Sequence, residues 1–287
     1  MVTLYQEVRS ALQESEFRPR KRLGQSFLVH ENVIQSILQL VDISSCDEVL
    51  EIGPGLGFLT RRLLEGGAKV WAVEVDPFLV RHLEQSPLRS NPAFQLIQGD
   101  ILKVSLGDIL PPRRIKVVGN LPYSISTPVL FRLFGWRQHF SHLVLMLQRE
   151  VAARLASHPG TKTYGTLSVW CQIHGRVVEK VSVSPEAFFP RPKVRSTILK
   201  VELFDAPRLD PAETALFEGL VRAAFGQRRK TLVNALTGLF RRNRREVERL
   251  LCDAALDPVR RGETLAVEEF IRLTRALKHG GVANPAS

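Results

Sequence analysis

The chain has 287 residues, 44% of them hydrophobic and 24% charged, so it is long enough to bury one large core or two ordinary ones. No apolar run approaches the roughly 18 residues of a membrane span, and charges are mixed freely into the first fifteen residues. We therefore expect neither a transmembrane protein nor a secretory signal. Lys and Arg number 40 against 29 Asp and Glu, a formal net charge of +11. This excess predicts a polyanionic partner, with nucleic acid first.

The cysteines and histidines argue against disulfides and metal binding. Cys46, Cys171 and Cys252 are odd in number and far apart, so they suggest neither a disulfide framework nor a zinc-binding CxxC pair. No further ligand cluster accompanies His139 and His142, and we expect them at the surface or at a strand edge. Unpaired cysteines fit a reducing cytosol, so we expect a cytoplasmic protein. Because the histidines lack further ligands nearby, we expect no metal.

The first forty residues predict an amphipathic start, a basic arm and a helix. Leu4, Val8 and Leu12 recur at helical spacing. The segment 17–23 (FRPRKRL) then places four cations in five residues around a proline, which is typical of an exposed arm and not of a helix interior. A second helical pattern covers residues 33–41.

A strand-then-helix rhythm begins at residue 48. Apolar strand-like runs occupy residues 48–52, 69–75, 94–97, 115–119 and 142–147, and helix-like stretches lie near 60–64, 78–85, 128–134 and 149–156. This alternation predicts an α/β fold with a mostly parallel sheet that is covered on both faces. After a helix near 166–173, the runs 176–183 and 196–203 predict a hairpin added to the sheet edge.

The composition changes near residue 206, where β-branched runs give way to short helical stretches. These stretches cover residues 211–224, 229–240, 244–255 and 267–277. We predict two domains, an α/β domain over residues 1–206 with the basic arm at its start and a small, all-helical domain over residues 207–287. By direct count, the second contains 15 Lys and Arg and 10 Asp and Glu, so the positive charge is spread over both.

The stretch VLEIGPGLGFLT predicts a strand, a glycine-rich turn and a helix. Gly53, Gly55 and Gly57 permit a tight turn and let a ligand approach the backbone, while amides at the start of the helix can face an anionic group. Glu74 ends the next strand, 21 positions after Gly53, where a carboxylate can accept both hydroxyl protons of a ribose. Nicotinamide and S-adenosylmethionine both remain possible cofactors on these residues alone.

Two further strand ends carry polar groups. The third strand ends at Asp100, where a carboxylate could bind an adenine amine, and the fourth ends in GNLPY, residues 119–123. Because ligands bind at the carboxyl ends of strands in open α/β sheets, all four features should meet in one crevice.

The residues after the fourth strand suit methyl transfer to an aromatic amine. Such a nitrogen is a poor nucleophile until acceptors for its two N–H protons favour a pyramidal geometry. Asn120 can supply a side-chain oxygen, and Pro122 holds the Leu121 carbonyl in an extended geometry. Tyr123 offers a face for base stacking. Proximity and electrostatic preorganisation would then supply most of the acceleration.

Nine motifs in order carry a family resemblance over residues 17–277: RKRLGQSFL, VLEIGPGLGFLT, VEVD, QGDIL, VVGNLPYSISTPVLF, MLQREVAARL, YGTLSV, FFPRPKVRS and FGQRRKTLVNAL. The chain resembles the ribosomal RNA adenine N6,N6-dimethyltransferases, most of all the bacterial small-subunit (16S) members whose loss gives kasugamycin resistance. The resemblance implies a Rossmann-like, S-adenosylmethionine-dependent methyltransferase domain. It implies dimethylation of two adjacent adenosines in a hairpin loop near the 3′ end of 16S ribosomal RNA, within an immature small ribosomal subunit.

The resemblance also implies roles for individual residues. The cofactor contacts would be Gly53, Gly55, Glu74, Asp100, Ile101 and Asn120, with Ser26 and Leu28 folding over the cofactor. The target-base pocket would be Asn120, Leu121, Pro122 and Tyr123, with Phe188 facing Tyr123 across a flipped adenine. Two positions depart from the family. Ser26 stands where Asn is more frequent, so its cofactor contact is expected to be weaker or made by the backbone, and Arg195 stands where Asp is frequent, which leaves its role open.

Basic clusters are predicted to contact RNA phosphates. The residues are Arg20, Lys21, Arg22, Arg191, Lys193, Arg228, Arg229, Lys230, Arg241, Arg242, Arg244 and Arg245. Those of the first domain precede residues assigned to the cofactor or the base, so they should position RNA at the chemistry. The basic residues of the second domain should bind structured RNA at a distance from the cofactor and base pocket. We expect the protein to act as a monomer.

Three alternatives stay open on the sequence. The first is a large-subunit adenine methyltransferase that confers macrolide resistance, and the second is a non-catalytic RNA-binding assembly or transcription factor on the same fold. The third is a nicotinamide-dependent dehydrogenase, which would bind NAD instead of S-adenosylmethionine.

Overall fold

The computed structural model describes residues 3–14, 19–20, 24–227, 229–240 and 243–279. The chain divides into two compact units, Met1–Ala152 with Gly175–Asp205, and Ala153–His174 with Ala206–Ser287. Most of the predicted basic arm, residues 17–18 and 21–23, lies outside the described residues. Among the described helices, none has the length and apolar character needed to cross a membrane.

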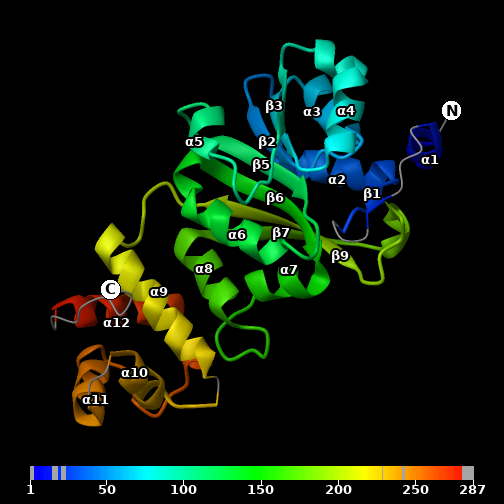
Figure 1. Ribbon diagram of the computed structural model, residues 1–287. Helices are drawn as coiled ribbons and strands as arrows, with labels where there is room; N and C mark the ends of the chain where they lie inside the picture. The colour runs from blue at the N-terminus through cyan, green and yellow to red at the C-terminus, as the bar shows by residue number, and fades with distance from the viewer. Residues whose placement is uncertain (1–2, 15–18, 21–23, 228, 241–242, 280–287) are drawn as a thin grey trace. The chain divides into compact units, whose positions relative to one another are not determined.

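A seven-stranded sheet forms the centre of the first unit (Figure 1). Its strands, in spatial order, are β4 (Phe94–Gln98), β3 (Lys69–Glu74), β2 (Glu48–Ile52), β5 (Ile115–Asn120), β6 (Phe140–Gln148), β9 (Ser196–Leu203) and β7 (Gly175–Val183). The first five are parallel, and β9 runs antiparallel to both β6 and β7. The prediction of an α/β fold with a mostly parallel sheet is confirmed, and so is the hairpin at its edge.

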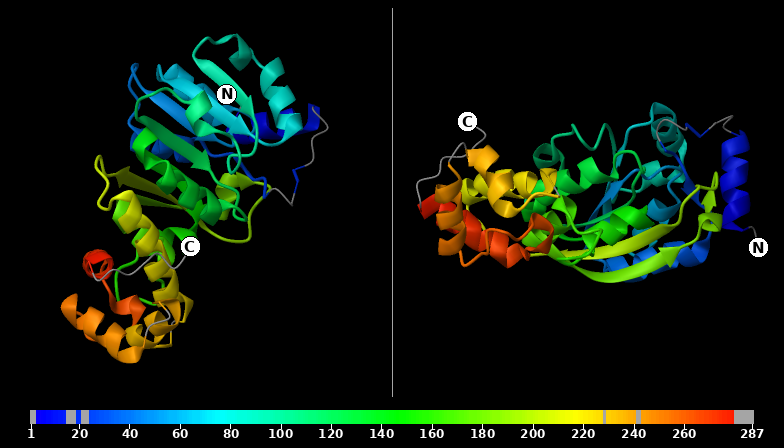
Figure 2. Two further views of the ribbon diagram at one scale, coloured as in Figure 1. Left: turned by 60° about the vertical axis from the view of Figure 1, so that its left-hand side comes forward. Right: turned by 90° about the horizontal axis from the view of Figure 1, so that it is seen from below.

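Helices cover both faces of this sheet, as continuous apolar strands require. They are α2 (Glu31–Val41), α3 (Phe58–Glu65), α4 (Pro77–Gln85), α5 (Leu106–Ile109), α6 (Ser126–Gly135) and the start of α7 (Arg149–Leu155). Figures 1 and 2 show α2 and α6 on opposite faces. All five residues of β2 are buried, so the glycine-rich turn that follows it starts from a rigid central strand.

The amino-terminal residues fold onto the first unit through a helix and a short strand. Helix α1 (Leu4–Glu14) buries its predicted apolar positions Leu4, Val8 and Leu12 in the core. Strand β1 (Phe27–Leu28) pairs antiparallel with β8 (Phe188–Phe189), at the end of the proline-rich turn between β7 and β9. This pairing joins segments about 160 residues apart and brings the stretch before β1 to the carboxyl edge of the sheet.

The second unit is helical. It contains α8 (Thr166–His174), α9 (Pro211–Gly226), α10 (Leu232–Phe240), α11 (Arg244–Asp253) and α12 (Val267–His279). Tyr164 is fully buried in the core of this unit, and its hydroxyl donates to the Leu265 carbonyl at 2.9 Å. Trp170 packs edge-on against Phe217.

The two units differ in one respect from the predicted domains 1–206 and 207–287. One division of the chain falls between Asp205 and Ala206, but the segment Ala153–His174 belongs to the helical unit. Its apolar side chains, among them Tyr164 and Val169, pack with helices that come after residue 206. Helical periodicity shows that a stretch has an apolar face, but it does not show which core that face joins.

Candidate active site

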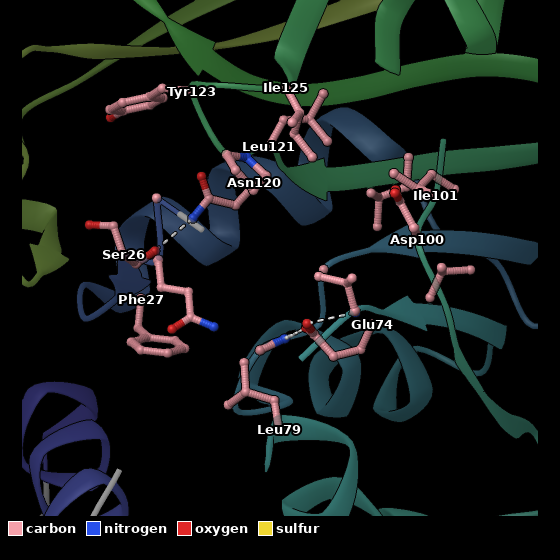
Figure 3. Close-up of a pocket in the computed structure, with 18 of the residues that line it drawn as sticks. Ser26, Phe27, Glu74, Leu79, Asp100, Ile101, Asn120, Leu121, Tyr123 and Ile125 are labelled. Atoms are coloured by element: carbon pink, nitrogen blue, oxygen red, sulfur yellow. Dashed lines mark hydrogen bonds between the residues drawn. The ribbon is translucent and has the colours of Figure 1, made fainter. Parts of the chain in front are cut away.

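A pocket lies at the carboxyl ends of β2, β3, β4 and β5, and we call it the strand-end pocket (Figure 3). Its volume is about 790 Å³ including its open mouth. Its wall consists of Gly24, Gln25, Ser26, Phe27, Ile52, Gly53, Gly55, Val73, Glu74, Val75, Leu79, Gly99, Asp100, Ile101, Asn120, Leu121, Pro122, Tyr123 and Ile125. The convergence expected from the sequence is therefore present in the structure.

The glycine-rich turn after β2 needs its glycines. Gly55 and Gly57 have φ angles of +61° and +82°, in the left-handed region that L side chains rarely adopt. A Cβ atom at Gly55 would lie 3.2 Å from the Phe27 ring, and one at Gly57 would lie 2.7 Å from a Leu88 methyl group. The bare backbone thus lets Phe27 close over the turn, and it leads directly into α3.

Glu74 is fixed by backbone amides at the end of β3. One carboxylate oxygen accepts from Val75 N and Asp76 N, both at 2.9 Å, and the other accepts from Gly55 N at 3.2 Å. Burial raises the pKa of this carboxyl, and the three amide donors oppose that rise. The side chain is 5% exposed and faces the pocket, where it can accept hydrogen bonds from the hydroxyls of a ribose.

Asp100 and Ile101 form the end of the strand-end pocket that lies away from Tyr123 (Figure 3). The Asp100 carboxylate accepts from Leu102 N at 2.9 Å, which orients it in the turn after β4. Ile101 is buried and adds an apolar wall beside that carboxylate. An apolar wall next to a single acceptor suits a flat heterocycle that carries an amino group.

At the other end of the pocket, the Asn120 side chain is oriented by the backbone. Its Nδ2 donates to the Ser26 carbonyl at 2.9 Å (Figure 3). A carbonyl oxygen can only accept, so Nδ2 must face Ser26, and Oδ1 is the atom left for a ligand. The next residue, Leu121, is buried, and its amide donates to the Met146 carbonyl at 3.2 Å, which fixes the start of the turn.

Tyr123 is held from a strand distant in sequence. Its hydroxyl and the Ser196 hydroxyl are 2.8 Å apart, and Ser196 is the first residue of β9. Burial raises the pKa of the Tyr123 phenol, so it is neutral at physiological pH. The hydrogen bond fixes the edge of a half-buried ring at the pocket mouth, and the face of such a ring can stack on a base.

The structure places the remaining predicted site residues in different surroundings. Ser26 lines the strand-end pocket, and its hydroxyl donates to the Pro190 carbonyl at 2.6 Å. Leu28 lines a smaller adjoining cavity of about 440 Å³ that also contains Glu51. Phe188 is 4% exposed in the core and is not among the residues that line the strand-end pocket. The structure therefore does not bring Phe188 to the wall beside Tyr123, and its role toward a base stays a prediction.

Ion pairing distinguishes the cations predicted to bind RNA. Arg20 pairs with Asp76 at 3.3 Å, Arg191 pairs with Glu186, and Arg244 pairs with Glu248 at 2.7 Å. Within the part of the chain that the structure describes, no acidic partner lies within salt-bridge distance of Lys193, Arg229, Lys230 or Arg245. Lys21, Arg22, Arg228, Arg241 and Arg242 lie outside the described residues.

Sequence reasoning missed several residues that the fold brings to this site. Gln25 and Phe27 line the pocket, although only their neighbours Ser26 and Leu28 were predicted to do so. Asp76, two residues after Glu74, is fully buried and contacts the amino-terminal segment, and the VEVD motif could have indicated it. Ser196 has no local signal, because only the antiparallel pairing of β9 brings it to Tyr123.

The fold and the site together define a class of protein. A doubly wound sheet with one antiparallel strand inserted near its edge, a glycine-rich turn after the first parallel strand and an acid at the end of the next are features of the nucleoside-binding α/β methyltransferases. Two solved structures share the fold. A dimethyladenosine transferase from Plasmodium falciparum aligns with a TM-score of 0.77 and 26% identity over 90% of this chain and 99% of that one. The 23S rRNA methyltransferase ErmE aligns with a TM-score of 0.66 and 26% identity, over 88% of this chain and 99% of the ErmE chain.

Sequence comparison identifies the family. The family profile described as "Ribosomal RNA adenine dimethylase" matches residues 16–273. The "Ribosomal RNA small subunit methyltransferase A" of Geobacter metallireducens is 45% identical over 91% of this chain and 96% of its own length. The protein of the same name from Alkaliphilus oremlandii is 37% identical over 92% of this chain and 93% of its own length. The chain therefore belongs to the ribosomal RNA adenine dimethylase family.

Proposed function

We propose that this protein transfers methyl groups from S-adenosylmethionine to N6 of adenosines in small-subunit ribosomal RNA, two methyl groups per base. The observation that carries the proposal is the orientation of Asn120, whose donor is occupied by Ser26 and whose acceptor is left for a ligand at the pocket end nearest Tyr123. The names of the relatives at 37–45% identity support the small subunit as the source of the RNA.

The strand-end pocket fits S-adenosylmethionine in its chemistry. Glu74 would hold the ribose hydroxyls, Asp100 and Ile101 would hold the adenine, and the backbone at Gly53 and Gly55 would lie along the methionine. When bound, this cofactor supplies a methyl group on a positively charged sulfur. A base would approach from the end that Asn120 and Tyr123 line, away from Asp100.

The residues after β5 would prepare the amine. Asn120 Oδ1 and the Leu121 carbonyl would accept the two N–H protons of N6, which favours a pyramidal nitrogen and directs its lone pair toward the methyl carbon. Held in this way, the N6 lone pair would take the methyl group, and S-adenosylhomocysteine would be the product. N6 then releases one proton to solvent. No residue becomes a covalent nucleophile, so orientation and preorganised acceptors carry the catalysis.

The second transfer meets an amine with only one N–H. The pocket must then accept a methylated nitrogen and still aim its lone pair, which a single acceptor such as Asn120 Oδ1 can do. N6 cannot be reached inside a paired helix, so the substrate would be unstacked RNA. We infer two adjacent adenosines in the hairpin loop near the 3′ end of 16S ribosomal RNA, within a partly assembled small subunit.

Methyl transfer from labelled S-adenosylmethionine to immature small subunits, compared with naked RNA, tests this function. We expect transfer to the subunits and a loss of about 100-fold or more in Asn120→Ala, with S-adenosylhomocysteine still bound. RNA binding with unchanged methyl transfer by Asn120→Ala would contradict the site. Calorimetric titration with S-adenosylmethionine and with NAD separates a methyltransferase from a dehydrogenase.

The structural similarity to ErmE gives one alternative a specific basis, because that protein is a 23S rRNA methyltransferase. Mass spectrometry of both ribosomal RNAs from cells that lack the protein separates the two substrates. We expect dimethyladenosine to disappear from the small-subunit RNA. Its disappearance from the large-subunit RNA alone would overturn the proposed substrate.

A further inference from the structure

The proposed reaction leaves a buried carboxylate without a role. Asp76 is fully buried, lies two residues after the proposed ribose-binding acid and is not part of the strand-end pocket wall. One of its oxygens accepts from Phe78 N at 3.0 Å, which caps α4. Its carboxylate also contacts two residues of the amino-terminal stretch, Gln25 and Arg20.

These contacts form a closed set among three residues, with one contact made by the backbone of Arg20. Gln25 Nε2 donates to Asp76 Oδ2 at 2.8 Å, and an Arg20 Nη1 lies 3.3 Å from Asp76 Oδ1. Arg20 N in turn donates to Gln25 Oε1 at 2.7 Å. The donors and acceptors of this set are consistent. Both carboxylate oxygens of Asp76 serve as acceptors, and the side-chain amide of Gln25 donates through its nitrogen and accepts through its oxygen.

The residues joined to Asp76 lead into the part of the chain that covers the pocket. We call Gly24–Leu28 the covering segment, and four of its five residues line the strand-end pocket. At its far side, the Ser26 carbonyl accepts from Asn120 and the Ser26 hydroxyl donates to Pro190. The segment is therefore attached to Asp76 beside Glu74 and to Asn120 beside the proposed methyl group, in addition to its contacts with Pro190 and β8.

Burial makes the attachment at Asp76 strong. A buried carboxylate that loses its cation and its hydrogen-bond donor is costly, whereas an exposed ion pair contributes little. Asp76 is fully buried and the Arg20 side chain is 42% exposed, so the carboxylate has this cationic partner when Arg20 lies against it. The Asp76 amide also donates to Glu74, which couples this attachment to the proposed ribose-binding acid.

We infer that Asp76 is a positioning residue that holds the covering segment over the bound cofactor through Gln25 and Arg20. Arg20 then serves cofactor binding and does not contact RNA phosphate, contrary to the prediction from its basic cluster. The inference rests on the proposed use of S-adenosylmethionine. Asp76 touches no reacting atom in this scheme and acts through the chain segment that closes the pocket.

Cofactor affinity and RNA affinity, measured on the full chain, separate the two roles of Arg20. We expect Arg20→Gln and Gln25→Leu each to weaken S-adenosylhomocysteine binding about three- to tenfold in calorimetry, and Asp76→Asn about tenfold, because hydrogen bonds to a buried charge are lost. In steady-state kinetics, the KM for S-adenosylmethionine should rise while kcat at saturation stays within about twofold. Arg20→Lys should restore most of the affinity.

The matched control is Arg176→Gln, which removes an exposed arginine on β7 that pairs with Glu202 on β9. It should leave cofactor affinity unchanged. Thermal unfolding of each variant without ligand checks the fold, and Asp76→Asn keeps an oxygen for the cap of α4. The salt dependence of RNA binding should be the same in Arg20→Gln and wild type.

The opposite pattern would overturn the inference. If Arg20→Gln binds S-adenosylhomocysteine as tightly as wild type and its RNA-binding salt slope falls by roughly 0.7–0.9, Arg20 is a phosphate contact. Variants that bind cofactor like wild type disprove the positioning role and leave the proposed function standing. A wild-type protein that binds no S-adenosylmethionine disproves both.

Discussion

Two side chains at the strand-end pocket have their polar groups fixed by partners far away in sequence. Asn120 is oriented by the Ser26 carbonyl, and Tyr123 by the Ser196 hydroxyl. Each bond leaves one functional surface free, an amide oxygen in the first case and a ring face in the second. Ser26 accepts from Asn120 with its backbone carbonyl, so this contact does not depend on the Ser26 side chain.

Tyr123 and Ser196 should behave as a pair in kinetics. Tyr123→Phe keeps a ring for stacking and loses the hydroxyl bond, so we expect the KM for RNA to rise only a few-fold. Tyr123→Ala removes the stacking surface, which contributes roughly 1–3 kcal/mol in base-binding sites, and should raise KM by about 5- to 150-fold. Ser196→Ala should match Tyr123→Phe, and the double variant should add nothing further. Additive effects in methyl-transfer assays would contradict this pairing.

The carboxyl of Glu51, buried beneath the glycine-rich turn, predicts a pH dependence of stability. Glu51 is 2% exposed, and burial raises its pKa from the ordinary 4.5 to about 7, although the Thr60 hydroxyl donates to it at 2.6 Å. Between these pH values the folded protein keeps the proton and the unfolded chain releases it, so stability falls as pH rises through this window.

We expect Glu51→Gln to remove that fall. The variant should match wild type near pH 4.5 and exceed its free energy of unfolding above pH 7 by up to about 3 kcal/mol, the equivalent of the pKa shift. Urea denaturation at a series of pH values between 4.5 and 8 measures the difference. Parallel curves for the two proteins would show that Glu51 does not titrate in this range.

Short strands and turns decide where the site residues lie. Pairing of β1 with β8 sets the covering segment against the proline-rich turn, and Phe188 is buried by the same pairing. Antiparallel insertion of β9 beside β6 brings Ser196 to the carboxyl edge of the sheet. The glycine-rich turn then connects the buried strand β2 to α3.

The turn at Gly57 should tolerate no side chain. In Gly57→Ala the new Cβ would lie 2.7 Å and 2.8 Å from methyl groups of Leu88 and Leu83, at a φ angle of +82°. We expect a loss of about 1–3 kcal/mol in the free energy of unfolding, measured by denaturant titration. Gly226→Ala is the control, because Gly226 ends helix α9 with open space around it and should be neutral or slightly stabilising. Equal effects of the two substitutions would contradict the steric argument.

For the protein as a whole, ion pairs reduce the part of the +11 charge that is free to bind RNA. Arg20, Arg191 and Arg244 have acidic partners in the structure, whereas Lys193, Arg229, Lys230 and Arg245 have none among the described residues. A cation that is already paired gains less from a phosphate than an unpaired one. Among the described cations of the predicted clusters, we therefore expect Lys193, Arg229, Lys230 and Arg245 to contribute more to RNA binding than Arg20, Arg191 and Arg244.

Arg244 and Arg245 provide a test within one helix. Arg244 pairs with Glu248 at 2.7 Å, and Arg245 is exposed on the same first turn of α11. We expect Arg245→Gln to weaken RNA binding and to lower the salt slope by roughly 0.7–0.9, and Arg244→Gln to have a smaller effect on both. Binding isotherms at several salt concentrations give the slopes. Unchanged affinity and slope in both variants would mean that this cluster is only a solvated surface.

The sequence by itself determined the features that depend on neighbouring residues. Apolar runs and helical spacing predict the strand and helix order, because burial and periodicity are set over a few positions. The glycines at 53, 55 and 57 and the polar strand ends at Glu74, Asp100 and Asn120 predict the crevice, since parallel strands expose their carboxyl ends on one edge.

Only the tertiary structure decided the features that join distant residues. Asn120 meets Ser26 across 94 positions, Tyr123 meets Ser196 across 73, and Gln25 meets Asp76 across 51. The assignment of Ala153–His174 to the helical unit and the burial of Phe188 belong to the same group. Local pattern does not show which segments far apart in the sequence pair, or which core a helix face joins. Those choices depend on packing over the whole chain.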